Sequence, residues 1–305
     1  MPTQGGARDL RYAPPTSTGY ITIDLERFRA SQHAAALEEV FRTTAADRVA
    51  DLDPNIRSII DLSRITLPLS GGTSLEPIDH NSSAVVDGAS AAQLLRILRA
   101  FSPDAPAASA GQIAGRNAQI FGDAAVVEVA PNVTVFGRQT ELEALLSNPA
   151  YAVPAFVAPR FVETQRAMLP SSVLEAVMTL DGAEPMAGSP LGSLRGVVGA
   201  SLDVGDRMEL VVYGSLEHEV AAQEVVRRME EFRRQAAALP LVMVFGAGPI
   251  LERARITRDG ATFRIVASME ADELRRILQQ FSALVEMGRD EDENEEEPEP
   301  DASMI

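Results

Sequence analysis

The sequence predicts an α+β fold of two similar halves, built from repeated strand–strand–helix units with antiparallel sheets and helices on one face. Two helical segments, residues 91–101 and 271–281, share six identities in eleven positions at an offset of 180. Hairpins that are followed by helices favour antiparallel sheets with the helices on one side. Four β-branched or apolar runs each end on a small residue directly before an amphipathic segment, at residues 85–88, 134–137, 211–214 and 265–268.

The chain of 305 residues divides best between residues 147 and 160, where three prolines interrupt an apolar run of poor periodicity. Length alone favours two domains or one large one. We therefore expect a disordered segment, a first α+β half, a second α+β half and a disordered acidic tail, over residues 1–17, 18–150, 151–287 and 288–305.

The first half begins with a strand. Residues 20–25 alternate apolar and polar side chains, as a half-buried strand does. Ser90 with Gln93 three residues later forms a capping box that starts the helix over 91–101. Residues 102–115, rich in alanine, proline and glycine, indicate a surface connector. The remaining elements are helices over 32–42, 53–60 and 140–146, strands over 65–69, 83–86, 124–129 and 133–136, and a loop over 71–81.

The second half repeats this order of elements. Asp259 and Gly260, between two strand-like runs, give the strongest hairpin signal in the chain. Gly288 lies just past the last periodic residue, where a helix C-terminus is expected. The predicted elements are strands over 173–180, 194–204, 207–213, 253–258 and 261–267, and helices over 217–237 and 270–285.

Two residue types are missing from the sequence, and their absence excludes several mechanisms. All 27 basic residues are arginine, and there is no cysteine. The chain therefore has no Schiff-base or phosphate-loop lysine, no thiol nucleophile, no thiolate metal site and no disulfide. No HExxH motif or histidine pair at helical spacing occurs either. We expect neither a metal nor a bound cofactor.

The net charge is −17, but nine of these negative charges lie within residues 290–301, so the rest of the chain carries only −8. An acidic protein is a poor partner for nucleic acid, which binds basic surfaces through counterion release. We interpret the acidic tail as solubilising. Its functional alternative is an adaptor segment that docks on a basic partner.

No apolar stretch approaches the ~20 residues that a membrane-spanning helix needs. The first 17 residues lack the apolar core of a secretory signal. The chain as written is therefore expected in the cytoplasm, whereas a signal removed upstream of residue 1 would place it in the cell envelope or periplasm.

The three histidines give one catalytic candidate. His33 and His218 lie in the first turns of predicted helices, where a solvated or locally bonded imidazole is expected. His80 lies in a predicted loop beside Asp79, with Ser70 upstream. A hydrolase needs a nucleophile, a base and a carboxylate that meet in space, so His80 with Asp79 or Ser70 is the candidate set. Adjacent Asp and His cannot form the usual relay, and no Gly-x-Ser-x-Gly elbow is present.

The order of elements and several short phrases resemble an uncharacterised group of repeat-containing bacterial envelope proteins, typical of GC-rich proteobacteria. Members of that group are often exported or lipid-anchored and have no assigned activity, so the resemblance implies no site residues. This sequence has neither the signal peptide nor the lipid-accepting cysteine of that group. The resemblance covers residues 20–285 and depends on residues 24–31, 134–137, 142–146 and 259–260.

Together these observations predict a non-enzymatic binding or scaffold protein. Repeated units leave apolar faces that only neighbours can cover, and few side chains suit catalysis. We expect the sheet faces or the groove between the halves to contact a protein or an apolar small molecule. The alternatives are the hydrolase built on His80 and the adaptor that uses the acidic tail.

Overall fold

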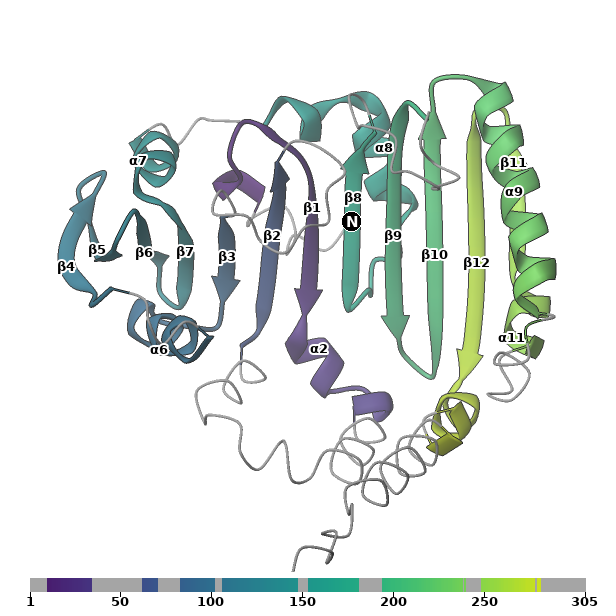
Figure 1. The fold of residues 1–305 in the computed structure, drawn as a ribbon, viewed down its shortest axis with the longest axis horizontal. Helices are drawn as coiled ribbons and strands as arrows, with labels where there is room; N and C mark the ends of the chain where they lie inside the picture. Colours follow the sequence, from purple (N-terminus) through teal and green to yellow (C-terminus); the bar gives the residue numbers. More distant parts are fainter. Residues whose placement is uncertain are drawn as a thin grey trace, which may run out of the picture.

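One large antiparallel sheet dominates the computed structural model. The structure describes residues 10–34, 62–70, 83–101, 106–147, 153–180, 194–237, 239, 248–277 and 279–280. Within them, twelve strands pair in the order β11-β12-β10-β9-β8-β1-β2-β3-β7-β6-β5-β4, with helices packed against the sheet (Figure 1). The predicted α+β class with antiparallel pairing is confirmed.

The described strands and helices have the following bounds. The strands are β1 (Ser17–Asp24), β2 (Arg64–Ser70), β3 (Ala84–Asp87), β4 (Ser109–Ile113), β5 (Arg116–Phe121), β6 (Ala124–Ala130), β7 (Val133–Arg138), β8 (Leu174–Thr179), β9 (Gly196–Val204), β10 (Arg207–Leu216), β11 (Arg255–Asp259) and β12 (Thr262–Glu270). The helices are α2 (Leu25–Arg29), α6 (Ala91–Phe101), α7 (Gln139–Ser147), α8 (Pro159–Ala167), α9 (Glu219–Ala237) and α11 (Gly248–Arg253), with 3-10 turns η1 (Leu10–Tyr12) and η3 (Pro154–Val157). Residues 271–277 are also helical.

The predicted hairpins are present. β2–β3, β6–β7, β9–β10 and β11–β12 each pair antiparallel, and a helix follows each pair. The backbone amide of Gln93 donates to the Ser90 hydroxyl over 3.3 Å, as the predicted cap of α6 requires. Most of the predicted helix over 32–42, the helix over 53–60 and the loop over 71–81 lie outside the described residues.

One part of the sequence prediction is wrong in detail. The expected connector over 102–115 contains β4, which pairs with β5 through a turn at Ala114 and Gly115. Most β4 side chains are exposed, so this edge strand shows little of the apolar alternation that reveals a strand. Within and just after residues 147–160, where a domain boundary is predicted, the structure has η3 and the start of α8, each with proline in its first turn.

Helices lie on both faces of the sheet, so the prediction of helices on one face is wrong. In β3, Val85 packs in the core cluster of α7, whereas the next residue, Val86, packs in that of α6. In β9, Val197 packs with α8 and Val198 packs with α9. Successive strand residues point to opposite faces, and nearly continuous apolar runs are typical of strands covered on both sides.

The strand register assigns each helix to a face. Val86 of the α6 cluster lies opposite Ile65 of β2, which lies opposite Ile23 of β1. Ile23 in turn lies opposite Leu174 of β8, and Leu174 lies opposite Leu202 of β9. Leu202 points to the same side of β9 as Val198, which packs with α9. Hence α6 and α9 share one face, which we call the α6 face. The helices α7 and α8 and the turn η3 share the other, which we call the α8 face.

Strands predicted for the two halves meet in the middle of the sheet. β1 pairs with β8 over five residue pairs, from Gly19 opposite Met178 to Ile23 opposite Leu174. We call this pairing the seam. Residues before and after the predicted boundary thus share one continuous sheet, and any surface over the seam is built from both parts of the chain.

Candidate functional site

On the α6 face, the paired residues of the five central strands β2, β1, β8, β9 and β10 are all apolar residues or glycine. Paired residues of β2, β1, β8, β9 and β10 form three rows across the seam, since residues opposite each other in a ladder point to the same side. The rows are Ile65–Ile23–Leu174–Leu202–Leu210, Leu67–Ile21–Ala176–Ala200–Val212 and Leu69–Gly19–Met178–Val198–Gly214.

Nine residues of these rows form a partly exposed surface that we call the seam patch. None of them belongs to the four core clusters formed by the described residues. Leu210, at one end, is 39% exposed, and the other eight are partly exposed. Figure 1 shows α6 and α9 on either side of the central strands. The members are Ile21, Ile23, Leu67, Leu69, Leu174, Ala176, Ala200, Leu202 and Leu210.

The α8 face of the same strands has the opposite character, because most of its side chains are polar, and several of them, including Tyr20 and Ser201, are buried. The Tyr20 hydroxyl donates to Glu175 Oε1 and accepts from Gln165 Nε2 of α8 over 3.0 Å. The Tyr20 ring packs against Phe156 and Phe161 with centroid distances of 5.8 and 6.0 Å. Buried polar atoms need such partners because desolvation without them is costly.

Further polar contacts tie α8 and the strands together on this face. Glu163 of α8 accepts from Tyr213 over 2.9 Å, and the Ser201 hydroxyl accepts from the Leu169 amide over 3.1 Å. Arg64 and Asp24 form an ion pair at 3.1 Å across β1 and β2. These groups are directed at one another within the protein. The α8 face therefore holds the sheet together, through contacts of α8 with β8, β9 and β10 and of η3 with β1.

Burial beneath α8 raises the pKa of Glu175 above its ordinary value of 4.5, although the Tyr20 hydroxyl and the charge of Arg64 oppose the shift. Burial also raises the pKa of Tyr20, and the Glu175 charge adds to the effect. The folded state thus favours the protonated carboxyl of Glu175. Its contribution to stability is present in full below pH 4.5 and is lost as the pH rises through the raised pKa.

Glu175→Gln is expected to remove this pH dependence while it keeps an oxygen acceptor for Tyr20. Relative to the wild type, the free energy of unfolding of the variant should increase as the pH rises above about 4.5, because only the wild type ionises a buried group. Urea denaturation of both proteins from pH 4.5 to pH 8.5 measures this difference. A difference that does not change with pH would contradict the proposed role of burial.

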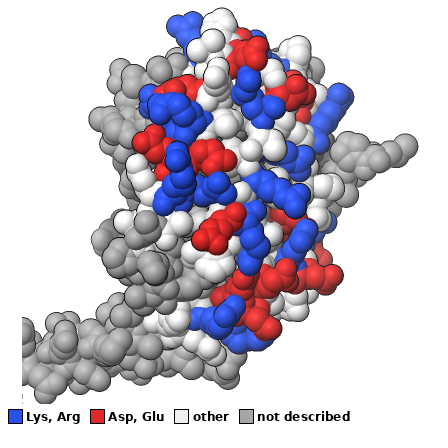
Figure 2. Space-filling model, turned by 90° about the vertical axis from the view of Figure 1, so that its right-hand side faces the viewer, with Lys and Arg blue, Asp and Glu red and all other residues white. Residues whose placement is uncertain are grey.

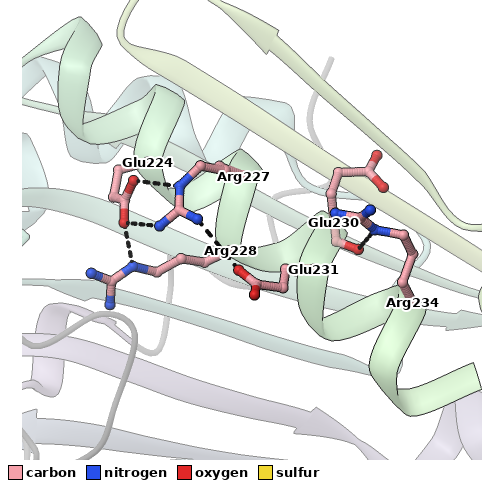
Figure 3. A network of polar contacts seen from close by, with 6 residues as sticks. All are labelled: Glu224, Arg227, Arg228, Glu230, Glu231 and Arg234. Atoms are coloured by element: carbon pink, nitrogen blue, oxygen red, sulfur yellow. Dashed lines mark hydrogen bonds and ion pairs between the residues drawn. The ribbon is translucent and has the colours of Figure 1, made fainter. Parts of the chain in front are cut away.

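The end of the sheet formed by α9 and the last hairpin is charged rather than apolar. Figure 2 shows arginine and acidic side chains interspersed over this surface. On α9, Glu224 accepts hydrogen bonds from Arg227 and Arg228, and Arg227 also pairs with Glu231 at 3.3 Å (Figure 3). These two arginines lower the pKa of Glu224 to about 2. Exposed pairs of this kind stabilise little, so they indicate a solvated helix face rather than a binding site.

The predicted catalytic residues are not brought together in the described part of the chain. Asp79 and His80 lie outside the described residues, and Ser70 ends β2. Within the described ranges, no three His, Asp or Glu side chains are grouped as metal ligands. His33, expected to be solvated or locally bonded, is only 1% exposed, and neither ring nitrogen has a hydrogen-bond partner. His218 is exposed, as expected for a solvated residue.

The seam patch was not identified from the sequence, although part of its signal is present. Residues 20–25 alternate, which places Ile21 and Ile23 on one side of β1. That alternation does not reveal which strand lies beside β1, because β8 follows about 150 residues later. The missed helix α8 does have a signal in Pro159 at its first turn, the position where proline is favoured.

Comparisons with known proteins assign the chain to no family. No family model and no curated protein matches the sequence. Crystal form III of TP0453 superposes with a TM-score of 0.48 at 11% identity, covering 90% of this chain and 98% of TP0453. Crystal form I gives 0.45 at 12% identity, covering 90% and 97%. No helix in the described residues has both the length and the apolar character needed to cross a membrane.

Proposed function

We propose that the protein is a non-enzymatic binding or scaffold protein that uses the seam patch to contact an apolar surface of a partner. One observation carries this proposal. The central strands place their apolar side chains on the partly exposed α6 face and most of their polar side chains on the covered α8 face. A sheet with one solvated face normally shows the reverse pattern. Contiguous exposed apolar surface marks interaction sites.

We also propose that the two halves derive from one repeated unit, which gives the patch equivalent strands from each half. Three consecutive strands, β1–β2–β3 and β8–β9–β10, start each half. A later hairpin then joins each set, with β7 beside β3 and β12 beside β10. The helices α6 and α9 occupy the same face in this arrangement. The seam would then be the pairing of two equivalent strands.

Binding of the dye ANS, which fluoresces on apolar surfaces, tests whether the patch is available. The wild type should bind ANS in its folded state, and Ala176→Glu, at the centre of the patch, should reduce the bound-dye fluorescence about five-fold. Leu210→Glu repeats the test at a position that is already 39% exposed and tolerates a charge better.

The matched control is Val220→Glu on α9, a side chain that is 76% exposed and lies outside the patch. It introduces the same charge and should leave the dye fluorescence unchanged. Circular dichroism must show that all the variants retain the fold. Equal dye fluorescence in the wild type and in both patch variants would refute the proposed function.

A further inference from the structure

We propose that the outer edge of β4 pairs antiparallel with β4 of a second copy of this chain, which joins the two sheets across a two-fold axis. β4 ends the sheet on the side away from β11, at the left of Figure 1, and is separate from the seam patch. Three observations carry the proposal. They are the contrast between the two sheet edges, the backbone groups that β4 turns outward, and the fit of β4 to itself.

The two edges of the sheet differ in how they are protected. β11, at one end, carries Arg255, Arg258 and Asp259, and α9 packs against it. β4, at the other end, has the sequence Ser-Ala-Gly-Gln-Ile, so its five residues include neither a charge nor a proline. Natural proteins protect edge strands with charged side chains, proline, bulges or a covering helix, because an unprotected edge accepts another strand. The composition of β4 therefore favours pairing with a further strand.

The turn between β4 and β5 fixes which residues of the two strands bond to each other. Ala114 and Gly115 have φ values of 49° and 73°, which are typical of a two-residue type I′ turn. Such a turn closes with a hydrogen-bonded pair, here Ile113 and Arg116. Bonded and non-bonded pairs alternate along an antiparallel ladder. Counted back from Ile113, every second residue of β4 therefore bonds to β5, and the residues between them turn their N–H and C=O groups away.

Ala110 and Gln112 are the two residues of β4 whose backbone groups point away from β5. Both residues are exposed. Among the described residues, no hydrogen bond joins these outward groups to another part of the chain. Two donors and two acceptors in line, at the spacing of alternate strand residues, are complementary to another extended backbone. The partner at this edge must therefore be a strand.

β4 is complementary to itself about a two-fold axis through Gly111. In this register Ala110 of each copy lies opposite Gln112 of the other, and the two pairs exchange four backbone hydrogen bonds. The two Gly111 residues face each other as a non-hydrogen-bonded pair, in which the Cα atoms are only about 4.5 Å apart. Glycine brings no side chain to this close position. The neutral strand also avoids local repulsion between copies of a chain whose net charge is −17, so a second copy is the occupant that the edge fits.

An apolar contact on the α8 face adds to the pairing. A Cβ added at Gly111 would overlap Ile120 Cδ1, which shows that the end of the Ile120 side chain covers this glycine. Ile120 is partly buried and packs against the core cluster of α7. The two-fold axis places the Ile120 side chains of both copies next to each other over the two glycines. Their mutual burial stabilises the dimer beyond the backbone hydrogen bonds.

Sedimentation velocity of the full-length chain over a range of concentrations tests the proposal. The wild type should form a dimer as its concentration rises. Gln112→Pro should raise the dissociation constant of the dimer at least ten-fold, because it removes an outward N–H and leaves an acceptor of the other copy unpaired. The bonds to β5 do not use this N–H, and proline is tolerated at such edge positions.

Two control variants accompany Gln112→Pro. Gln112→Ala changes the same side chain but keeps the N–H, and it should leave the dissociation constant unchanged. Ala176→Glu, on the seam patch, should also leave it unchanged. Circular dichroism of each variant shows whether the fold is retained.

Disulfide trapping tests the register, because the full-length chain has no cysteine of its own. Ala110→Cys and Gln112→Cys are mixed in equal amounts and oxidised slowly, and the products are identified by mass spectrometry. Opposite residues of a hydrogen-bonded pair have Cα atoms about 5.5 Å apart, which a disulfide can bridge, whereas diagonal neighbours are ~7–8 Å apart. The disulfide between the two variants should therefore exceed that within either variant at least ten-fold.

Four results would overturn the proposal. They are a monomer at every concentration, a dimer that folded Gln112→Pro does not weaken, a dimer that Ala176→Glu abolishes, and disulfides in the proportions of random pairing. If Gln112→Pro did not fold, the trapping experiment would decide, because neither cysteine variant alters the backbone.

Discussion

Replacing Phe161 by alanine is expected to lower the free energy of unfolding by about 3–5 kcal/mol, the usual cost of removing a fully buried aromatic ring. Phe161 of α8 is 0% exposed and packs against Phe156 with ring centroids 4.9 Å apart. It also contacts Tyr20 of β1 and lies in the same core cluster as Val177 of β8. One side chain therefore attaches α8 to both strands of the seam. Urea denaturation followed by circular dichroism measures the loss.

Val157→Ala in the neighbouring turn η3 is the control. Val157 is 65% exposed, so its truncation removes little buried surface and should change the stability by less than about 0.5 kcal/mol. A loss below about 1.5 kcal/mol for Phe161→Ala would mean that the cavity collapses readily. It would also mean that α8 does not anchor the α8 face of the seam.

Local patterns in the sequence predict much of the fold because they report on local structure. Short turns fix the hairpins, as Asp259 and Gly260 do between β11 and β12, and apolar periodicity marks α6 and α9. The pairing of β1 with β8 has no local signal, since its partners are about 150 residues apart. The face on which each helix packs depends on that non-local order, which explains why the prediction of helices on one face fails.

The candidate site could be predicted only in part for the same reason. Reactive side chains are visible in a sequence, so attention falls on His80 and its neighbours. A binding surface made of ordinary Ile, Leu and Ala residues becomes visible only when the register brings them together. Ile21 meets Ala176 across the seam, and Ala176 meets Ala200 in the next strand. Nothing in the local sequence of β8 shows that these residues share one exposed face.

Gly19→Ala is expected to cost about 1–3 kcal/mol by overpacking the seam. A Cβ at Gly19 would lie 2.5 Å from the carbonyl oxygen of Val177 and 2.8 Å from the Cα of Met178. Both obstacles are backbone atoms of β8, which cannot move aside as a flexible side chain can. Strands β1 and β8 must therefore separate locally. Urea denaturation measures the cost, and amide hydrogen exchange locates it.

Exchange should accelerate for β1 and β8 amides in Gly19→Ala and remain unchanged for the distant pair β6–β7. Gly205→Ala in the β9–β10 turn is the matched control, because the nearest atom to its added Cβ is a side-chain oxygen of Asp203 at 3.8 Å. The seam patch is built from both strands, so Gly19→Ala should also lower ANS binding. If exchange accelerated uniformly through the sheet, the strain would not be confined to the seam, and the two parts of the chain would unfold as one unit.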